Sequence, residues 1–215
     1  MSFLNQLKSQ ASALQTQNTM LVQRSDANTA QTELACRTVW LYVSDLAKQL
    51  SVIAPDGPRL ALDNKNPWPQ MKMIDFRADT RKKKLRDKDV CDYIAMGWDI
   101  VPREGPALAG AVSVNFPPDL ERVEKRLSFG GVRHERKEVR HPEKNTLQAF
   151  RFEYVTQARG NVTVTTDHDK GELLFRLANI SGFEIIHTTV QAERVCTELM
   201  DEMAKMLLGQ THQFL

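Results

Sequence analysis

The chain has 215 residues, of which 41% are apolar and 26% charged, the balance of an ordinary globular protein. Its 29 basic and 27 acidic residues leave a formal net charge of +2, so the chain as a whole is not marked as a nucleic-acid or membrane protein. A chain of this length can bury a core without disulfides or metal. This composition excludes wholesale disorder.

The N-terminal sequence and the cysteines predict a reducing compartment. The first residues lack the basic segment followed by an unbroken apolar stretch that a signal peptide needs. No segment approaches the roughly 20 apolar residues of a membrane span. Cys36, Cys91 and Cys196 are odd in number, far apart and without a CxxC pair, which favours buried free thiols over disulfides. We therefore expect a cytoplasmic protein with no transmembrane segment.

Residues 2–22 are predicted to form a helix with a narrow apolar stripe. Apolar residues recur at spacings of three and four, while the other face is Gln, Ser and Asn: Phe3, Leu4, Leu7, Ala11 and Leu14. Three interpretations are open: packing on its own domain, pairing with another copy or a protein partner, or lying on a membrane surface. We expect residues 1–24 to be an association helix that supports a homo-oligomer or a protein partner.

A second helix is predicted over residues 29–53, capped by Asn28. Its core-facing side carries Cys36, Val39, Trp40, Val43, Leu46, Ala47 and Leu50. Leu34, Leu41 and Tyr42 broaden this face, so the helix is expected to be well buried. The breakers in residues 55–58 end it. Residues 25–215 are expected to form a single α+β domain.

From residue 70 onward the apolar period changes to two, which indicates strands. Alternation in the second of these strands is expected to place on one face Val90, Asp92, Ile94, Met96 and Trp98. Strand follows strand across short turns, without βαβ alternation. The expected fold is α+β: a mainly antiparallel sheet with N-terminal helices and a long C-terminal helix on one face. Four helices are expected, the last two at about residues 117–129 and 192–209.

Sequence motifs for catalysis are absent, among them GxxxxGK[ST], GxSxG, HExxH and GxGxxG. The most site-like string is Thr165–Gly171, where His168 stands between Asp167 and Asp169. A hairpin turn explains this composition better than a metal or acid–base site, although the latter stays open. His187, among apolar and hydroxyl residues, is interpreted as a sheet histidine rather than a catalytic base. We expect no metal and no cofactor.

A basic segment covers residues 77–88, with seven bases and two acids, a local charge of +5. It is predicted to be a basic turn between two strands. The residues expected to bind an anion are Arg81, Lys82, Lys83, Lys84 and Arg86. Such a density attracts nucleic acid or another polyanion, or anionic lipid. The alternative is a solvated strand edge whose lysines prevent edge pairing.

The residues alone do not settle the biochemical activity or whether the chain is an enzyme. The leading hypothesis is a non-catalytic soluble binding or interaction protein. One alternative is a nucleic-acid-associated protein that uses residues 77–88. Another is an enzyme or small-ligand carrier with a pocket between the sheet and the C-terminal helix.

Overall fold

The computed structural model describes residues 3–215 and confirms the α+β class. The helices are α1 (Phe3–Ile53), α2 (Pro117–Phe129) and α3 (Thr197–Leu207), with a 3-10 turn η1 (Ala192–Arg194). The strands are β1 (Met71–Leu85), β2 (Lys88–Pro102), β3 (Ala109–Val114), β4 (His134–Arg140), β5 (Leu147–Val155), β6 (Ala158–Asp167), β7 (Glu172–Ala178) and β8 (Ile185–Gln191). They form two sheets, and every strand pairing in them is antiparallel.

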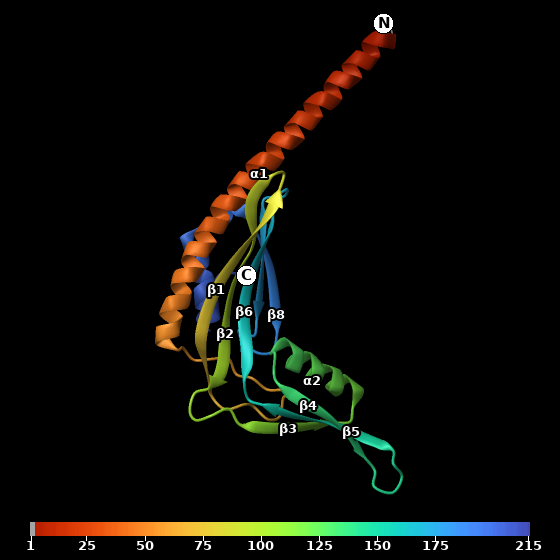
Figure 1. The fold of residues 1–215 in the computed structure, drawn as a ribbon, viewed down its shortest axis with the longest axis vertical. Coiled ribbons are helices and arrows are strands. Elements are labelled where there is room, and N and C mark those ends of the chain that lie inside the picture. The colour runs from red at the N-terminus through yellow and green to blue at the C-terminus, as the bar shows by residue number, and fades with distance from the viewer. Residues whose placement is uncertain (1–2) are drawn as a thin grey trace.

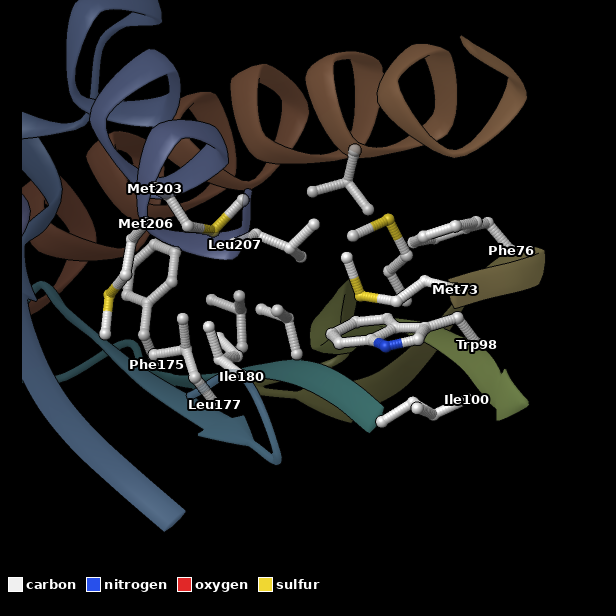
Figure 2. Close-up of a cluster of buried hydrophobic side chains, with 14 of the residues drawn as sticks. Met73, Phe76, Trp98, Ile100, Phe175, Leu177, Ile180, Met203, Met206 and Leu207 are labelled. Atoms are coloured by element: carbon white, nitrogen blue, oxygen red, sulfur yellow. The ribbon is translucent and has the colours of Figure 1, made fainter. Parts of the chain in front are cut away.

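The larger sheet has the order β1-β2-β6-β7-β8, and α1 and α3 cover one of its faces (Figure 1). Alternate strand residues point toward the helices and form the core. Figure 2 shows Phe175 and Leu177 of the sheet beneath Met203 and Leu207 of α3, with Trp98 further along the same layer. All five side chains are buried, so the C-terminal helix packs on one face of the sheet as predicted.

The smaller sheet, β3-β5-β4, lies at the end of the molecule opposite the N-terminus, beside α2 (Figure 1). Sequence patterning missed β4, because all seven of its residues are exposed and none alternates with a core position. Its side chains pair across the strands instead. The Lys137 ammonium lies 2.6 Å from the Glu153 carboxylate, and the Arg136 guanidinium lies 3.9 Å from the centre of the Phe150 ring.

The two predicted N-terminal helices are one continuous 51-residue helix, so the prediction of four α-helices was wrong within the described residues. No Gly or Pro occurs between residues 22 and 29 to break the helix. Asn28 does not cap a new helix. Its side-chain amide instead donates to the carbonyl oxygen of Asp169 at 2.6 Å. The hydroxyls of Thr29 and Thr32 donate to carbonyls four residues earlier, within the helical ladder.

Only one face of α1 is buried on the body of the protein. Val43 is buried, as predicted, whereas Trp40 and Leu46 are half-buried at the edge of the contact. Leu34 and Leu41 are 59% and 61% exposed, so the expectation that they broaden the buried face was wrong. The physical reason is that a single sheet covers one stripe of a helix, and nothing in the described chain packs on the opposite side.

The basic segment lies mostly in a strand, which corrects the prediction of a basic turn. Strand β1 continues to Leu85, β2 begins at Lys88, and only Arg86 and Asp87 form the connection. Both have positive φ, 47° and 63°, as a two-residue type I′ hairpin requires.

The predicted C-terminal helix is divided. Residues 192–194 form η1, and α3 begins only at Thr197. Met203 is buried and Leu199 is half-buried, so the predicted apolar side of this helix faces the core.

Candidate interaction arm and basic hairpin

Most of the predicted anion-binding side chains are held by carboxylates. Both Nε and Nη2 of Arg81 donate to Asp92 Oδ2, at 2.9 and 2.6 Å. Lys83 Nζ lies 3.4 Å from the other oxygen of the same carboxylate, and Lys84 Nζ lies 3.2 Å from Asp89 Oδ1. The hydrogen bond from Arg81 is the main reason that the pKa of Asp92 is lowered, so this carboxylate stays ionised beside the bases.

An irregularity in the β1–β2 ladder places Asp92 among the bases. Arg81 pairs with Tyr93, but the next residue, Lys82, pairs with Cys91, so Asp92 is an extra residue on its strand. Alternation without this irregularity would have put Asp92 on the buried face with Ile94. The sequence suggested that buried placement, and the structure instead turns Cys91 inward and Asp92 outward.

Arg86 at the hairpin tip reaches the turn between β6 and β7 and the helix α1. It donates a short hydrogen bond to Asp169, lies 4.0 Å from the Asp26 carboxylate, and reaches Thr29 Oγ1 at 3.5 Å. Ser25 Oγ donates to Asp169 Oδ1 at 2.8 Å. These contacts hold two hairpin tips against α1 between residues 25 and 29.

The carboxylates change the charge of the predicted anion site. Four acids from outside residues 77–88 form ion pairs with bases of this segment, so its charge of +5 is partly offset: Asp26, Asp89, Asp92 and Asp169. Of the five predicted residues, Lys82 alone has no ion pair within residues 3–215. A surface whose bases are already paired attracts a polyanion weakly. This favours the alternative, a solvated strand edge whose lysines prevent pairing with another strand.

The string Thr165–Gly171 forms the predicted hairpin turn. Asp167 Oδ1 accepts the Lys170 backbone N–H at 3.1 Å, and Gly171 has a positive φ of 71°. No group of three or more His, Cys, Asp or Glu side chains among the described residues is arranged to hold a metal ion. His187 is exposed on strand β8 and lies apart from the turn.

His168, by contrast, is buried, and its ring supports the irregular strand position at Cys91. Its Nε2–H donates to the Cys91 carbonyl at 2.7 Å, and the Thr166 hydroxyl donates to the same oxygen at 2.9 Å. The Cys91 backbone N–H donates to Glu33 Oε1 at 2.7 Å. Side chains thus supply hydrogen-bond partners to the backbone of Cys91 beside the irregular position.

The same place brings Cys36 of α1 against Cys91 of β2. The two thiols influence each other's pKa, and both side chains are buried. The contact with Cys91 and then burial raise the pKa of Cys36, so its thiol stays protonated and is a poor nucleophile. Cys196 is exposed.

The region between the sheet and α3, where a ligand pocket was an alternative, is packed with apolar side chains (Figure 2). Hollows occur on the surface instead. One of about 540 Å³ lies over the smaller sheet beside Ala109, Ala111 and Glu153. Another of about 570 Å³ lies where α1 leaves the body, lined by Leu21, Arg24, Ser25, Asn28, Asp169, Lys170, Glu172 and Gln191.

The first part of α1 extends beyond the body of the protein (Figure 1). We call residues 3–24 the arm; residues 1 and 2 of the predicted association helix lie outside the described residues. Leu7, Leu14 and Leu21 on the arm are 45%, 60% and 58% exposed. At 1.5 Å per residue the arm is about 33 Å long.

The apolar stripe of the arm continues the face that α1 buries on the sheet. Residues eighteen positions apart lie five helical turns apart on the same face. Leu14 is thereby aligned with Thr32 and Leu50, and Leu21 with Val39, and these three body residues are buried. We define the stripe as Leu7, Ala11, Leu14 and Leu21, with the polar Asn18 interrupting it between Leu14 and Leu21. Within residues 3–215, nothing packs on it.

No protein-family model, curated protein or solved structure matches this chain. None of the helices in residues 3–215 is both long and apolar enough to cross a membrane. Three structural features are therefore the basis for inferring function: a packed body, a basic hairpin whose bases are mostly ion-paired, and an exposed helical arm.

Proposed function

We propose that this chain is a non-catalytic interaction protein whose arm binds a helical protein surface through its apolar stripe. The observation that carries the proposal is the exposure of Leu7, Leu14 and Leu21 on the same face that α1 buries elsewhere. An isolated helix of about 20 residues is marginal in water, because most helical stability in proteins comes from packing of an apolar face. A partner on the stripe supplies that packing.

The body supports this role by fixing the direction of the arm. Buried α1 residues from Thr32 to Leu50 hold the helix on the sheet, and Asp169 holds it at Ser25 and Asn28. The arm is a direct continuation of that anchored helix, without a Gly or Pro hinge. An interaction protein gains affinity from such preorganisation, since less conformational freedom is lost on binding.

The test replaces the stripe and compares it with the opposite face. One variant carries Leu7→Ala, Leu14→Ala and Leu21→Ala. The matched control carries Ser9→Ala, Thr16→Ala and Gln23→Ala, each two positions further along and about 200° around the helix. Alanine keeps helix propensity high in both.

Two measurements are made on the full chain and both variants: the mass by light scattering, and chemical crosslinking in an extract of the source cells. We expect the stripe variant to lose association, with itself or with another protein, while the control keeps it and both retain the melting temperature of the parent. If the stripe variant and the control behave like the parent in both measurements, the arm is not an interaction surface.

A further inference from the structure

We infer that the partner of the arm is the arm of a second copy of this chain, running antiparallel to the first. This inference rests on the proposed function and names the occupant of the stripe. The spacing of the stripe is the three-four alternation by which helices pack side by side, with leucines seven residues apart at positions 7, 14 and 21. Such a stripe is complementary to a copy of itself.

The position of the body excludes the parallel arrangement. From Thr32 to Leu50 the side of α1 that carries the stripe is occupied by the chain's own sheet. A parallel partner helix would run about 8–10 Å away on that side. It would overlap with the sheet along the part of α1 that follows residue 25. Figure 1 shows the body at one end of the arm, so an antiparallel pair would place the two bodies at opposite ends of the paired arms.

The size of the stripe residues indicates the register. If Ala11 of one arm lies opposite Leu14 of the other, a small residue faces a large one on both sides of the two-fold axis, and Leu7 lies opposite Asn18. The axis then falls between Ser12 and Ala13, close to the middle of the arm, so that the arms overlap along their whole length. Both copies use the same surface, as a two-fold interface requires.

This register brings the end of each arm to a hollow on the other copy. Phe3, which is 73% exposed, falls opposite Val22 of the second arm. Leu21, the neighbour of Val22 in the sequence, lines the hollow of about 570 Å³ at the base of the arm. Pairing would therefore bring Phe3 close to that hollow at both ends of the pair.

The charges of the arm agree with the antiparallel direction. Lys8 and Arg24 are its only charged residues. A parallel pair would place Lys8 and Arg24 of one arm beside the same residues of the other arm. The antiparallel pair separates the two Lys8 residues by roughly 13 Å and the two Arg24 residues by roughly 34 Å along the axis. Repulsion between like charges is lower at these distances.

Spin-label distances on the full chain test the direction of pairing. Single labels are attached at Ser12→Cys or Gln23→Cys, two outward-facing positions, with Cys196→Ser in both because that thiol is exposed. The antiparallel register puts the two Ser12 labels almost level, and the two Gln23 labels about 31 Å apart along the axis. We therefore expect a much longer distance between labels at 23 than between labels at 12. The three stripe substitutions should abolish both distances, and Ser9→Ala with Thr16→Ala should preserve them.

Equal distances at the two positions would show a parallel pair and overturn the inference. A chain that stays monomeric at about 100 µM, where even a weak pair of this size should form, would also overturn it. In either case the proposed function survives if the stripe variant still loses a crosslinked partner that the control retains. If neither self-association nor such a partner depends on the stripe, both fail.

Discussion

The hydroxyl of Ser25 donates a 2.8 Å hydrogen bond to the carboxylate of Asp169, 144 residues away, where α1 leaves the body. The same carboxylate accepts from Arg86, and the Asp169 carbonyl accepts from the Asn28 side chain at 2.6 Å. One residue of the β6–β7 turn therefore holds the base of the arm to both hairpin tips.

Replacing this residue, Asp169→Ala, should loosen the base of the arm without unfolding the body. The ion pair is largely exposed, so global stability should fall by no more than about 1 kcal/mol. Amide hydrogen exchange at residues 25–32 should become several-fold faster, because local opening no longer breaks the contacts to Ser25 and Arg86. Glu121→Ala on α2 serves as the control for loss of an exposed acid. Unchanged exchange at residues 25–32 would show that Asp169 does not hold the helix.

Gly160→Ala should destabilise the larger sheet. A Cβ at residue 160 would lie 2.2 Å from Cε2 of the Trp98 indole, whose ring is buried and has little room to move. We expect a loss of about 1–3 kcal/mol in the free energy of unfolding, measured by denaturant titration with tryptophan fluorescence. Gly97→Ala is the matched control, because its Cβ would meet only a carbonyl oxygen at 3.8 Å. Equal stability of the two variants would contradict the packing described for Trp98.

Tyr42 connects α1 to α3, and its contribution should depend on pH. Its hydroxyl donates to Asp201 Oδ1 at 2.6 Å, and Tyr42→Phe should cost about 1 kcal/mol at neutral pH. Burial, and then the bond to Asp201, raise the pKa of Tyr42 above its ordinary value of about 10. The stabilising contribution is therefore complete below pH 10 and is lost as pH rises further. Chemical unfolding at pH 7 and pH 11 should show the difference between parent and variant shrinking. A difference that grows with pH would contradict this assignment.

Thiol titration should separate Cys196 from the two buried cysteines. Cys36 and Cys91 are 4% and 6% exposed, whereas Cys196 is exposed. An aromatic disulfide reagent should therefore label one thiol rapidly in the folded chain and three in denaturant. Cys196→Ser should remove the fast reaction entirely. Rapid labelling of two or three thiols in the folded parent would show that the contact between α1 and β2 opens readily.

Sequence patterning predicted the fold class because most elements carry strong periodicity. Core residues such as Ile94, Met96 and Trp98 alternate along β2, and Val39, Val43 and Leu50 recur on α1. Elements without a buried face were missed, as β4 shows. The turn at residues 165–171 was predicted correctly because its Asp and Gly residues carry local backbone chemistry.

The candidate site was harder to predict because its partners are distant in sequence. The positive charge of the surface around residues 77–88 was overestimated, since Asp26 and Asp169 reach the hairpin only through folding. A strict alternation of two also cannot reveal an extra residue in a strand ladder. For this reason Asp92 was predicted on the wrong face of β2. Leu7, Ala11 and Leu14 of the stripe were predicted from the sequence, whereas Leu21 was not. The exposure of the stripe was not predicted either, because exposure depends on where the body ends.

Amide hydrogen exchange at residues 7–24 of the full chain, measured at two protein concentrations, tests most directly that the arms pair with each other. The account predicts slow exchange at about 100 µM and fast exchange after dilution to about 1 µM, since pairing of two chains follows mass action. Leu7→Ala, Leu14→Ala and Leu21→Ala together should give fast exchange at both concentrations, while Ser9→Ala, Thr16→Ala and Gln23→Ala should match the parent. Exchange at residues 7–24 that is independent of concentration in the parent would contradict pairing of the arms.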